Sequence, residues 1–168
     1  DLVRSATRTA VRVAPAVMAG HSDIGADVAT GPPPRRGRVM VVDDSIVTRM
    51  LEKSILEAAG YDVQVAADGQ EALRQMRVAA PDLVVSDVNM PNMDGLALTH
   101  AIRCESQWQS IPVILVTSLD ASDDHARGME AGADAYIVKS SFSQEGLLQT
   151  VGRLLPATRG SDANRSRR

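Results

Sequence analysis

The sequence predicts an α/β fold in which a parallel five-stranded sheet is covered by helices on both faces. Three observations predict it: five short apolar runs, an enrichment of β-branched residues in most of those runs, and segments of helical spacing between them. This alternation of strands and helices over about 119 residues indicates five βα units with right-handed crossovers. The expected fold class is therefore a doubly wound (βα)5 sheet.

The elements follow one another in strict alternation. The expected strands are residues 39–42, 63–66, 83–86, 113–116 and 135–138. After the first strand, Gly60 is expected to stop a helix whose apolar residues are predicted to share one face: Ile46, Val47, Met50, Leu51, Ile55 and Ala58. Further helices are expected over 70–80, 95–105, 121–131 and 143–155.

The two ends of the chain differ from its centre in composition and charge. Residues 1–36 finish in a Gly/Pro/Arg-rich stretch and are predicted to form a largely disordered linker, and residues 156–168 a disordered basic tail. Residues 39–155 carry eight basic and seventeen acidic groups, a net charge of −9, and the segments on either side each carry +3. The expected folded domain, residues 37–155, is therefore acidic between two basic ends.

Composition excludes several classes of function. Aromatic residues make up only 2% of the chain, which disfavours base-stacking recognition of single strands, and the acidic body disfavours direct binding of nucleic acid. The single Cys104 excludes an internal disulfide and is compatible with a reducing cytosol. No apolar run is long enough to span a bilayer, so we expect a cytoplasmic protein without membrane attachment.

Polar residues follow four of the five expected strands. In an open parallel sheet, ligands bind beyond the carboxyl ends of the strands. Those ends deliver three carboxylates, a hydroxyl and an ammonium: Asp43 and Asp44, then Asp87, Thr117 and Lys139. We therefore expect these side chains to converge at one edge of the sheet.

A cluster of three carboxylates requires a cation. Two carboxylates about 4 to 5 Å apart repel by roughly 3 to 4 kcal/mol at an effective dielectric constant near 20. Mg²⁺, or Mn²⁺, suits such oxygen ligands, and with Lys139 it brings the site to neutrality. Asp87, alone at the end of the central strand, is the expected nucleophile toward a phosphoryl group. Asp43 and Asp44 are expected to hold the metal, with the backbone carbonyl of Asn89 as a further ligand.

Four motifs resemble those of the receiver domains of two-component response regulators. They are Val41–Ser45, Asp87–Gly95, Val116–Ser118 and Gly132–Lys139, in the family's order and spacing. The resemblance implies the flavodoxin-like strand order 2-1-3-4-5. It also implies that Asp87 accepts the phosphoryl group with Mg²⁺ held by Asp43, Asp44 and Asp87, that Thr117 and Lys139 stabilise it, and that Thr117 and Tyr136 form the switch.

The resemblance also implies a signalling role rather than catalysis of turnover. A histidine kinase or phosphotransfer domain is the expected phosphoryl donor, possibly a kinase core attached to this chain, and self-dephosphorylation is expected to be slow. No output domain is expected after residue 155. The receiver is then expected to act by docking a partner, modulating an attached kinase or draining phosphate from it.

One motif departs from the family pattern. The family has a proline after the lysine, across a cis peptide bond, whereas Ser140 and Ser141 follow Lys139 here. A cis bond costs roughly 3 to 4 kcal/mol before a residue other than proline, so a trans or strained loop is expected. The segment Lys139–Phe142 resembles receivers at the C-terminus of chemotaxis-type hybrid histidine kinases, and Asp1–Ala6 resembles the end of a coupling-protein-like domain. We therefore expect a longer parent chain, a sensor histidine kinase.

Two other functions compete with the receiver. A haloacid-dehalogenase-like phosphatase places a second Asp two residues after its nucleophile, where this sequence has Ser45. A pseudo-receiver used only for binding is disfavoured because all five site residues are present. Among the remaining residues, Asp94 is expected to start a helix, and His21, His100 and His125 are expected to lie away from the acidic edge.

Overall fold

A computed structural model describes residues 35–118 and 122–156 of the chain. The expectations for the linker before residue 35, for a preceding coupling-protein-like domain and for the basic tail after residue 156 lie outside the described residues. His21 also lies outside them.

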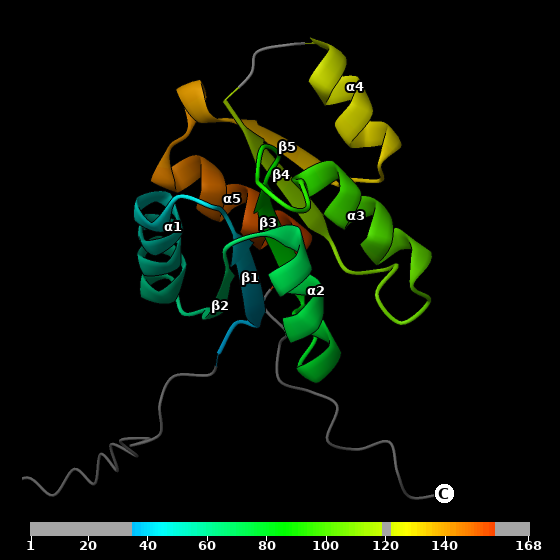
Figure 1. Cartoon of the computed structure of the whole chain (residues 1–168). Helices are drawn as coiled ribbons and strands as arrows, with labels where there is room; N and C mark the ends of the chain where they lie inside the picture. The colour runs from blue at the N-terminus through cyan, green and yellow to red at the C-terminus, as the bar shows by residue number, and fades with distance from the viewer. Residues whose placement is uncertain (1–34, 119–121, 157–168) are drawn as a thin grey trace, which may run out of the picture. The chain divides into compact units, whose positions relative to one another are not determined.

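The described residues form one five-stranded sheet. The strands are β1 (Arg38–Val42), β2 (Asp62–Ala66), β3 (Leu83–Asp87), β4 (Val113–Thr117) and β5 (Ala135–Val138). All neighbouring strands are parallel, and their order is β2-β1-β3-β4-β5 (Figure 1). The predicted fold class and strand order are confirmed, and β3 is the central strand.

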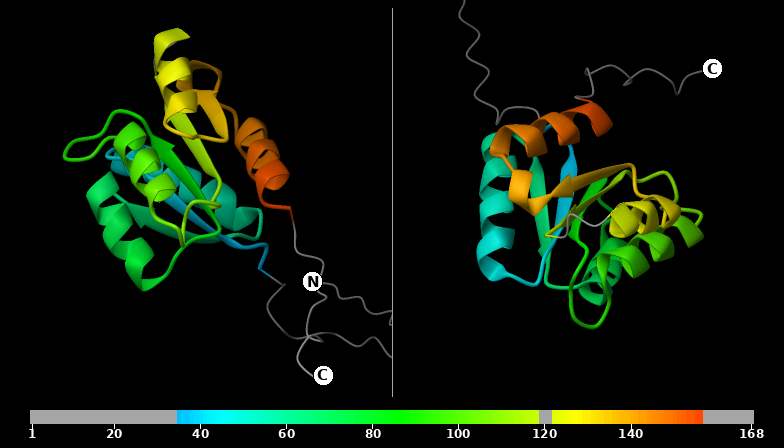
Figure 2. Two further views of the ribbon diagram at one scale, coloured as in Figure 1. Left: turned by 90° about the vertical axis from the view of Figure 1, so that its right-hand side faces the viewer. Right: turned by 90° about the horizontal axis from the view of Figure 1, so that it is seen from above.

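Helices cover both faces of the sheet, as Figure 2 shows. The helices are α1 (Ile46–Ala58), α2 (Gly69–Val78), α3 (Gly95–Cys104), α4 (Ser122–Glu130) and α5 (Gln144–Leu154), with a 3-10 turn, η1, at Lys139–Ser141. Helices α1 and α5 lie on one face, and α2, α3 and α4 lie on the other. None of the helices among the described residues has the length and apolar character to cross a bilayer.

Alternate residues of each strand belong to two separate cores. On β4, Val113 and Leu115 pack with residues of α2 and α3, and Ile114 and Val116 pack with residues of α1 and α5. Because a strand buried on both faces has no polar side, β1, β3 and β4 are mostly apolar, and their polar residues lie at their ends: Arg38 at the start of β1, Ser86 and Asp87 at the end of β3, and Thr117 at the end of β4. The central strands are therefore rigid supports for whatever their carboxyl ends carry.

Short polar side chains fix the start of four helices. Ser45, Asp68, Asp94 and Ser143 each accept a hydrogen bond from the backbone N–H three residues later. Asp94 is thus a cap of α3, as predicted. At the other end of α1, Gly60 adopts a positive φ of 95°, a conformation that favours glycine, and the chain turns there into β2.

In the first two turns of α1, the predicted apolar face does not pack against the sheet. Ile46, Val47, Met50 and Leu51 are between 44% and 75% exposed. The buried residues of the helix are instead Glu52, Ile55 and Leu56. The apolar residues of α1 thus divide between a buried stripe and an exposed N-terminal patch, called here the α1 patch (Ile46, Val47, Met50 and Leu51).

Candidate functional site

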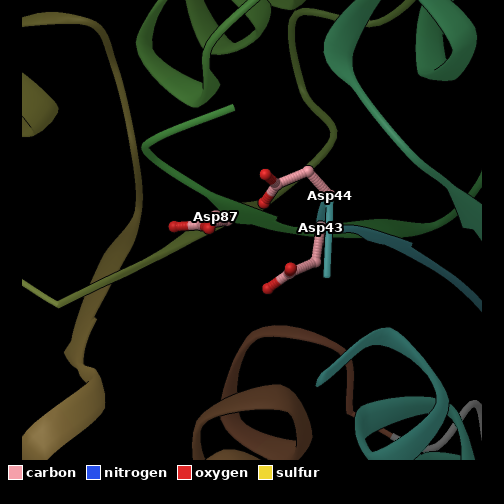
Figure 3. Close-up of side chains that lie close together, drawn as sticks. All are labelled: Asp43, Asp44 and Asp87. Carbon is pink, nitrogen blue, oxygen red and sulfur yellow. The ribbon is translucent and has the colours of Figure 1, made fainter. Parts of the chain in front are cut away.

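Three carboxylates meet at the carboxyl end of the two neighbouring strands β1 and β3 (Figure 3). Asp43 and Asp44 directly follow β1, and Asp87 is the last residue of β3. One carboxylate oxygen from each residue lies within 4.8 Å of the others. Asp43 and Asp87 are buried, whereas Asp44 is exposed to solvent. The structure therefore brings the predicted acidic cluster together with one open side.

Lys139 reaches this cluster from the end of β5. Its Nζ donates to Asp87 Oδ2 at 3.0 Å and lies 3.5 Å from Asp43 Oδ2. Only 1% of the Asp43 side chain and 7% of the Asp87 side chain are exposed, compared with 30% of the Lys139 side chain. One ammonium thus bridges two buried carboxylates that lie at the ends of different strands.

Burial and neighbouring charges have opposing effects on the pKa of Asp43 and on the pKa of Lys139. Burial raises the pKa of Asp43, against the lowering effects of the Ser45 backbone N–H and the Lys139 charge. Burial by itself would lower the pKa of Lys139, but the hydrogen bond and charge of Asp87, together with Asp43, raise it. Lys139 is therefore held firmly in its ammonium form.

Backbone contacts fix the position of the carboxylates. Asp43 Oδ1 accepts from the Ser45 backbone N–H at 2.7 Å, and the Arg49 guanidinium donates to the Asp43 carbonyl oxygen. The Asn89 backbone N–H lies 3.3 Å from Asp87 Oδ1. At Gly95 the chain passes so close that a Cβ would lie 2.2 Å from the Asp87 carbonyl oxygen. The end of β3 therefore has no room for a side chain at residue 95.

Thr117 and Tyr136 lie on adjacent strands and on the same face of the sheet. Thr117 ends β4 and is fully buried. The register pairs Leu115 with Tyr136 and Thr117 with Val138, and side chains alternate along a strand, so Thr117 and Tyr136 share the face covered by α4. The Tyr136 hydroxyl is buried and has no hydrogen-bond partner among the described residues.

The loop after Lys139 is compact without a proline. The described residues contain no cis peptide bond, so Lys139–Ser140 is trans. Lys139–Ser141 form η1, in which the Ser141 hydroxyl donates to the Val138 carbonyl and the Phe142 backbone N–H donates to the Lys139 carbonyl. A turn of 3-10 helix thus carries the lysine, and the trans alternative of the prediction holds.

A fourth carboxyl, which was not predicted, lies close to the site. This carboxyl, Glu52, is only 2% exposed. Together with Lys139 and Phe142 it lines a cavity of about 170 Å³. Burial, and then the charge of Asp43, raise its pKa from 4.5 to about 8, so Glu52 is uncharged at neutral pH. In the sequence, Glu52 lies four residues after Thr48 and three before Ile55. This helical spacing was the signal that could have placed Glu52 on the same face of α1 as buried Ile55.

Neither described histidine belongs to the acidic cluster. His100 lies on α3, where it contacts Cys104. The His125 ring of α4 packs edge-on against the Tyr136 ring, with centroids 5.0 Å apart. The expectation that these two residues lie away from the acidic edge therefore holds, but the contact between His125 and Tyr136 was not predicted.

The donor set of the cluster fits a hard divalent cation. Asp43, Asp44 and Asp87 offer only oxygen ligands, and no histidine or cysteine belongs to the group. The exposed side of Asp44 leaves access for solvent or a substrate oxygen. Mg²⁺, which retains several waters when bound to proteins, matches this arrangement better than a soft metal does.

Comparison with known proteins agrees with the geometry. The sequence profile of the response regulator receiver domain matches residues 39–152. Among solved structures, the signal receiver domain of a signal transduction histidine kinase from Syntrophus aciditrophicus is 37% identical, with a TM-score of 0.68 over 76% of this chain and 96% of that one. Chemotaxis protein CheY4 of Vibrio cholerae is 40% identical, with a TM-score of 0.67 over 70% of this chain and 98% of CheY4.

Curated relatives are longer than the matched region. The gliding motility regulatory protein of Myxococcus xanthus is 38% identical over 140 residues, which cover 83% of this chain and 18% of that protein. The transcriptional regulatory protein PrrA of Mycobacterium tuberculosis is 42% identical over 77% of this chain and 54% of PrrA. This chain therefore spans a fifth to about half of the length of such relatives. On the evidence of its fold, its acidic cluster and these matches, the chain belongs to the response regulator receiver domain family.

Proposed function

We propose that this chain is a phosphoryl-accepting switch in which Asp87 takes a phosphoryl group from a phosphohistidine of a partner. The observation that carries the proposal is the position of Asp87 at the end of the central strand, buried beside two carboxylates and 3.0 Å from Lys139. In the transfer, an Asp87 carboxylate oxygen forms the new bond to phosphorus while the phosphorus–nitrogen bond breaks. The imidazole leaves with the electron pair of that bond and takes a proton from solvent.

Three carboxylates and one backbone carbonyl are proposed to hold the metal. Asp43, Asp44 and Asp87 would bind Mg²⁺ or Mn²⁺, and the Asn89 carbonyl would be a further ligand. When bound, the metal would screen the negative charge on the oxygens of the incoming phosphoryl group. Lys139, which follows β5, supplies a second positive charge, and its ammonium would then pair with a phosphoryl oxygen in place of Asp87.

Thr117 and Tyr136 are proposed to convert the new charge into a change of surface. Val116 of β4 pairs with Asp87 in the register, and Thr117 is the next residue. The Thr117 hydroxyl is therefore close enough along the strand to donate to a phosphoryl oxygen on Asp87. Movement of Thr117 toward that oxygen would vacate space on the face that Tyr136 shares. We propose that Tyr136 then moves and shifts the population of the surface formed by α4, β5 and α5.

The α1 patch is proposed to be the docking surface for the phosphohistidine donor. Its four apolar side chains begin two residues after Asp44 and are 44% to 75% exposed. A contiguous exposed apolar surface is typical of protein interaction sites. A histidine kinase or phosphotransfer domain bound there would place its histidine near Asp87. The similarity to the receiver of a Syntrophus histidine kinase supports an attached kinase core as one such donor.

The proposal is tested by incubating the protein with acetyl phosphate or beryllofluoride and Mg²⁺, and mapping the modified residue by mass spectrometry or NMR. We expect one modification at Asp87, abolished by Asp87→Asn and by chelation of the metal. Asp82→Asn is the matched control, because Asp82 is an exposed aspartate just before the opposite end of β3. Turnover of added phosphoesters would favour a phosphatase, and an unmodified protein would favour a pseudo-receiver.

A further inference from the structure

The loop between β3 and α3, residues 88–94, is fastened to the start of α2. The Asn92 side-chain amide donates to Asp68 Oδ2 at 2.8 Å. Asn92 also has a φ of 66°, the only positive φ of a residue other than glycine in the described part of the chain. Asparagine tolerates this left-handed conformation better than most residues do. The turn at Asn92 and its hydrogen bond to Asp68 therefore fix the same point of the loop.

Asp68 makes two contacts, one with each carboxylate oxygen. Its Oδ1 accepts from the Glu71 backbone N–H at 2.8 Å and so caps α2, and its Oδ2 accepts from Asn92. The Glu71 N–H and the Asn92 amide hold the pKa of Asp68 below its ordinary value. Asp68 is therefore an ionised carboxylate at neutral pH, and hydrogen bonds to ionised groups are stronger than those between neutral groups.

A second contact lies beside the first. The Gly69 backbone N–H donates to the Met93 carbonyl oxygen at 3.2 Å. A Cβ at residue 69 would lie 2.7 Å from Met93 Cγ and 3.0 Å from Met93 Cβ, so the loop approaches the start of α2 more closely than a side chain there would allow. The Asp68–Asn92 and Gly69–Met93 contacts are called here the loop latch.

We propose that the loop latch positions the loop for metal binding, which makes Asp68 and Asn92 positioning residues of the metal site. The inference rests on the proposed function, in which the Asn89 carbonyl is a metal ligand. The Asn89 backbone N–H lies 3.3 Å from Asp87 Oδ1, and Asn92 follows three residues later, so the loop is held both at the acidic cluster and at α2. A binding site that is correctly formed for only part of the time has an apparent affinity reduced by that fraction. Loss of the latch should therefore weaken metal binding, although neither latch residue belongs to the acidic cluster.

The test is the dissociation constant for Mg²⁺, measured by NMR titration of the full chain in wild type, Asp68→Asn, Asn92→Asp and the double variant. Asp68→Asn removes one of the two acceptor oxygens, and Asn92→Asp removes the donor, whereas the double variant exchanges donor and acceptor. Asparagine at residue 68 remains a good helix cap. The two substitutions change the charge in opposite directions, and these effects on Mg²⁺ add, so the double-mutant cycle isolates the hydrogen bond. We expect the double variant to bind Mg²⁺ about two- to tenfold more tightly than additivity predicts, the range for one hydrogen bond.

Two further measurements leave the charge unchanged. Asn92→Gly removes the amide at a residue whose positive φ suits glycine, and it should weaken Mg²⁺ binding by about two- to tenfold. Gln70→Ala, at an exposed residue in the first turn of α2, is the control and should keep the wild-type affinity. By linkage, Mg²⁺ should in turn stabilise the latch and slow hydrogen exchange of the Gly69 amide in wild type.

Additive effects in the double-mutant cycle, or an unchanged affinity in Asn92→Gly, would overturn the inference. So would hydrogen exchange at Gly69 that does not respond to Mg²⁺, because a latch coupled to the metal site must be strengthened when the metal binds. A wild-type protein that does not bind Mg²⁺ would instead contradict the metal site of the proposed function.

Discussion

Glu52 combines features that rarely occur together at a single residue. Its side chain is buried on α1, faces a cavity shared with Lys139, and has a pKa raised to about 8 by burial and by Asp43. An ionised carboxylate at that position would add a fourth negative charge beside Asp43 and Asp87. Because the group remains protonated at neutral pH, the folded protein avoids that repulsion.

The raised pKa of Glu52 predicts a pH-dependent loss of stability. Between the ordinary pKa of 4.5 and about 8, the folded state binds this proton and the unfolded state does not. The free energy of unfolding therefore falls as pH rises through that window, by up to about 1.4 kcal/mol per pH unit. In Glu52→Gln this contribution is absent. Urea unfolding in EDTA at about pH 5 and about pH 8 should show a larger loss in wild type than in the variant.

The matched control for this measurement is Glu57→Gln. Glu57 lies on the same helix, is exposed, and pairs weakly with Lys53 at 3.7 Å. This variant should follow the wild-type pH dependence, because it leaves Glu52 in place and removes only an exposed ion pair, which contributes little to stability. A parallel loss of stability in wild type and Glu52→Gln would show that Glu52 does not carry the effect.

Gly95 and Gly152 differ in the space around them, although both lie in helices. A Cβ at Gly95 would lie 2.2 Å from the Asp87 carbonyl oxygen and 3.1 Å from the Val88 Cα, whereas a Cβ at Gly152 meets nothing within 4 Å. Gly95→Ala should destabilise the protein by about 1–3 kcal/mol, since backbone must move, and should slow modification of Asp87. Gly152→Ala should stabilise it by up to about 1 kcal/mol through helix propensity. Thermal unfolding of both variants provides the check, and equal effects would contradict the steric argument.

At the scale of elements, the strands were more predictable than the orientation of α1. The strands that lead to Asp43, Asp87 and Thr117 are buried on both faces and mostly apolar, and the position of polar residues at their carboxyl ends follows from parallel topology. Periodicity along α1 located the helix but not the side that packs on the sheet. The buried stripe contains Glu52, and the α1 patch is exposed, so hydrophobicity alone indicated the wrong face.

The end of α3 is joined to the start of β5 by one arginine. Arg103 donates to the carbonyl oxygens of Gly132 and Ile111 at 2.9 and 2.8 Å and pairs with Asp134 at 2.8 Å. Asp134 Oδ2 also accepts from the Val113 backbone N–H at the start of β4. A planar guanidinium with several donors makes this set of contacts, which an ammonium on a lysine stem does not reproduce.

Replacement of Arg103 should therefore loosen the junction of α3, β4 and β5. Arg103→Ala is expected to lower the free energy of unfolding by about 1–3 kcal/mol, and Arg103→Lys should recover little of it. Arg77→Ala, at an exposed arginine in the last turn of α2, is the control and should stay within about 0.5 kcal/mol of wild type. Full recovery by lysine would show that charge alone, rather than the fork of donors, holds the junction. Denaturant unfolding distinguishes these outcomes.

At the scale of the whole molecule, negative charge is concentrated where a cation is expected. Residues 39–155 carry seventeen acidic and eight basic groups, and three of the acidic groups lie within 4.8 Å of one another at one edge of the sheet. Lys139 offsets part of that repulsion through Asp87 and Asp43. The remaining repulsion acts on the folded state and not on the extended chain, so whatever neutralises the cluster should stabilise folding.

Divalent metal should therefore raise stability through this cluster and not through general screening. A ligand bound only by the folded state stabilises it by about 2.7 kcal/mol at a concentration one hundred times its dissociation constant. The unfolding midpoint should rise with Mg²⁺ well beyond the rise produced by NaCl of equal ionic strength, and EDTA should reverse it. Asp44→Asn is the informative variant, because Asp44 is the exposed member of the cluster and its loss spares the buried contacts of Asp43 and Asp87.

In Asp44→Asn the metal-free stability should equal or exceed that of wild type, since one source of repulsion is gone, while the gain with Mg²⁺ should largely disappear. Glu57→Gln removes a carboxylate elsewhere on the acidic body and should keep the full gain. If Asp44→Asn and Glu57→Gln respond alike to Mg²⁺, the stabilisation arises from the overall negative charge of the domain. If only Asp44→Asn loses it, the effect arises at the strand ends, where the proposed phosphoacceptor lies.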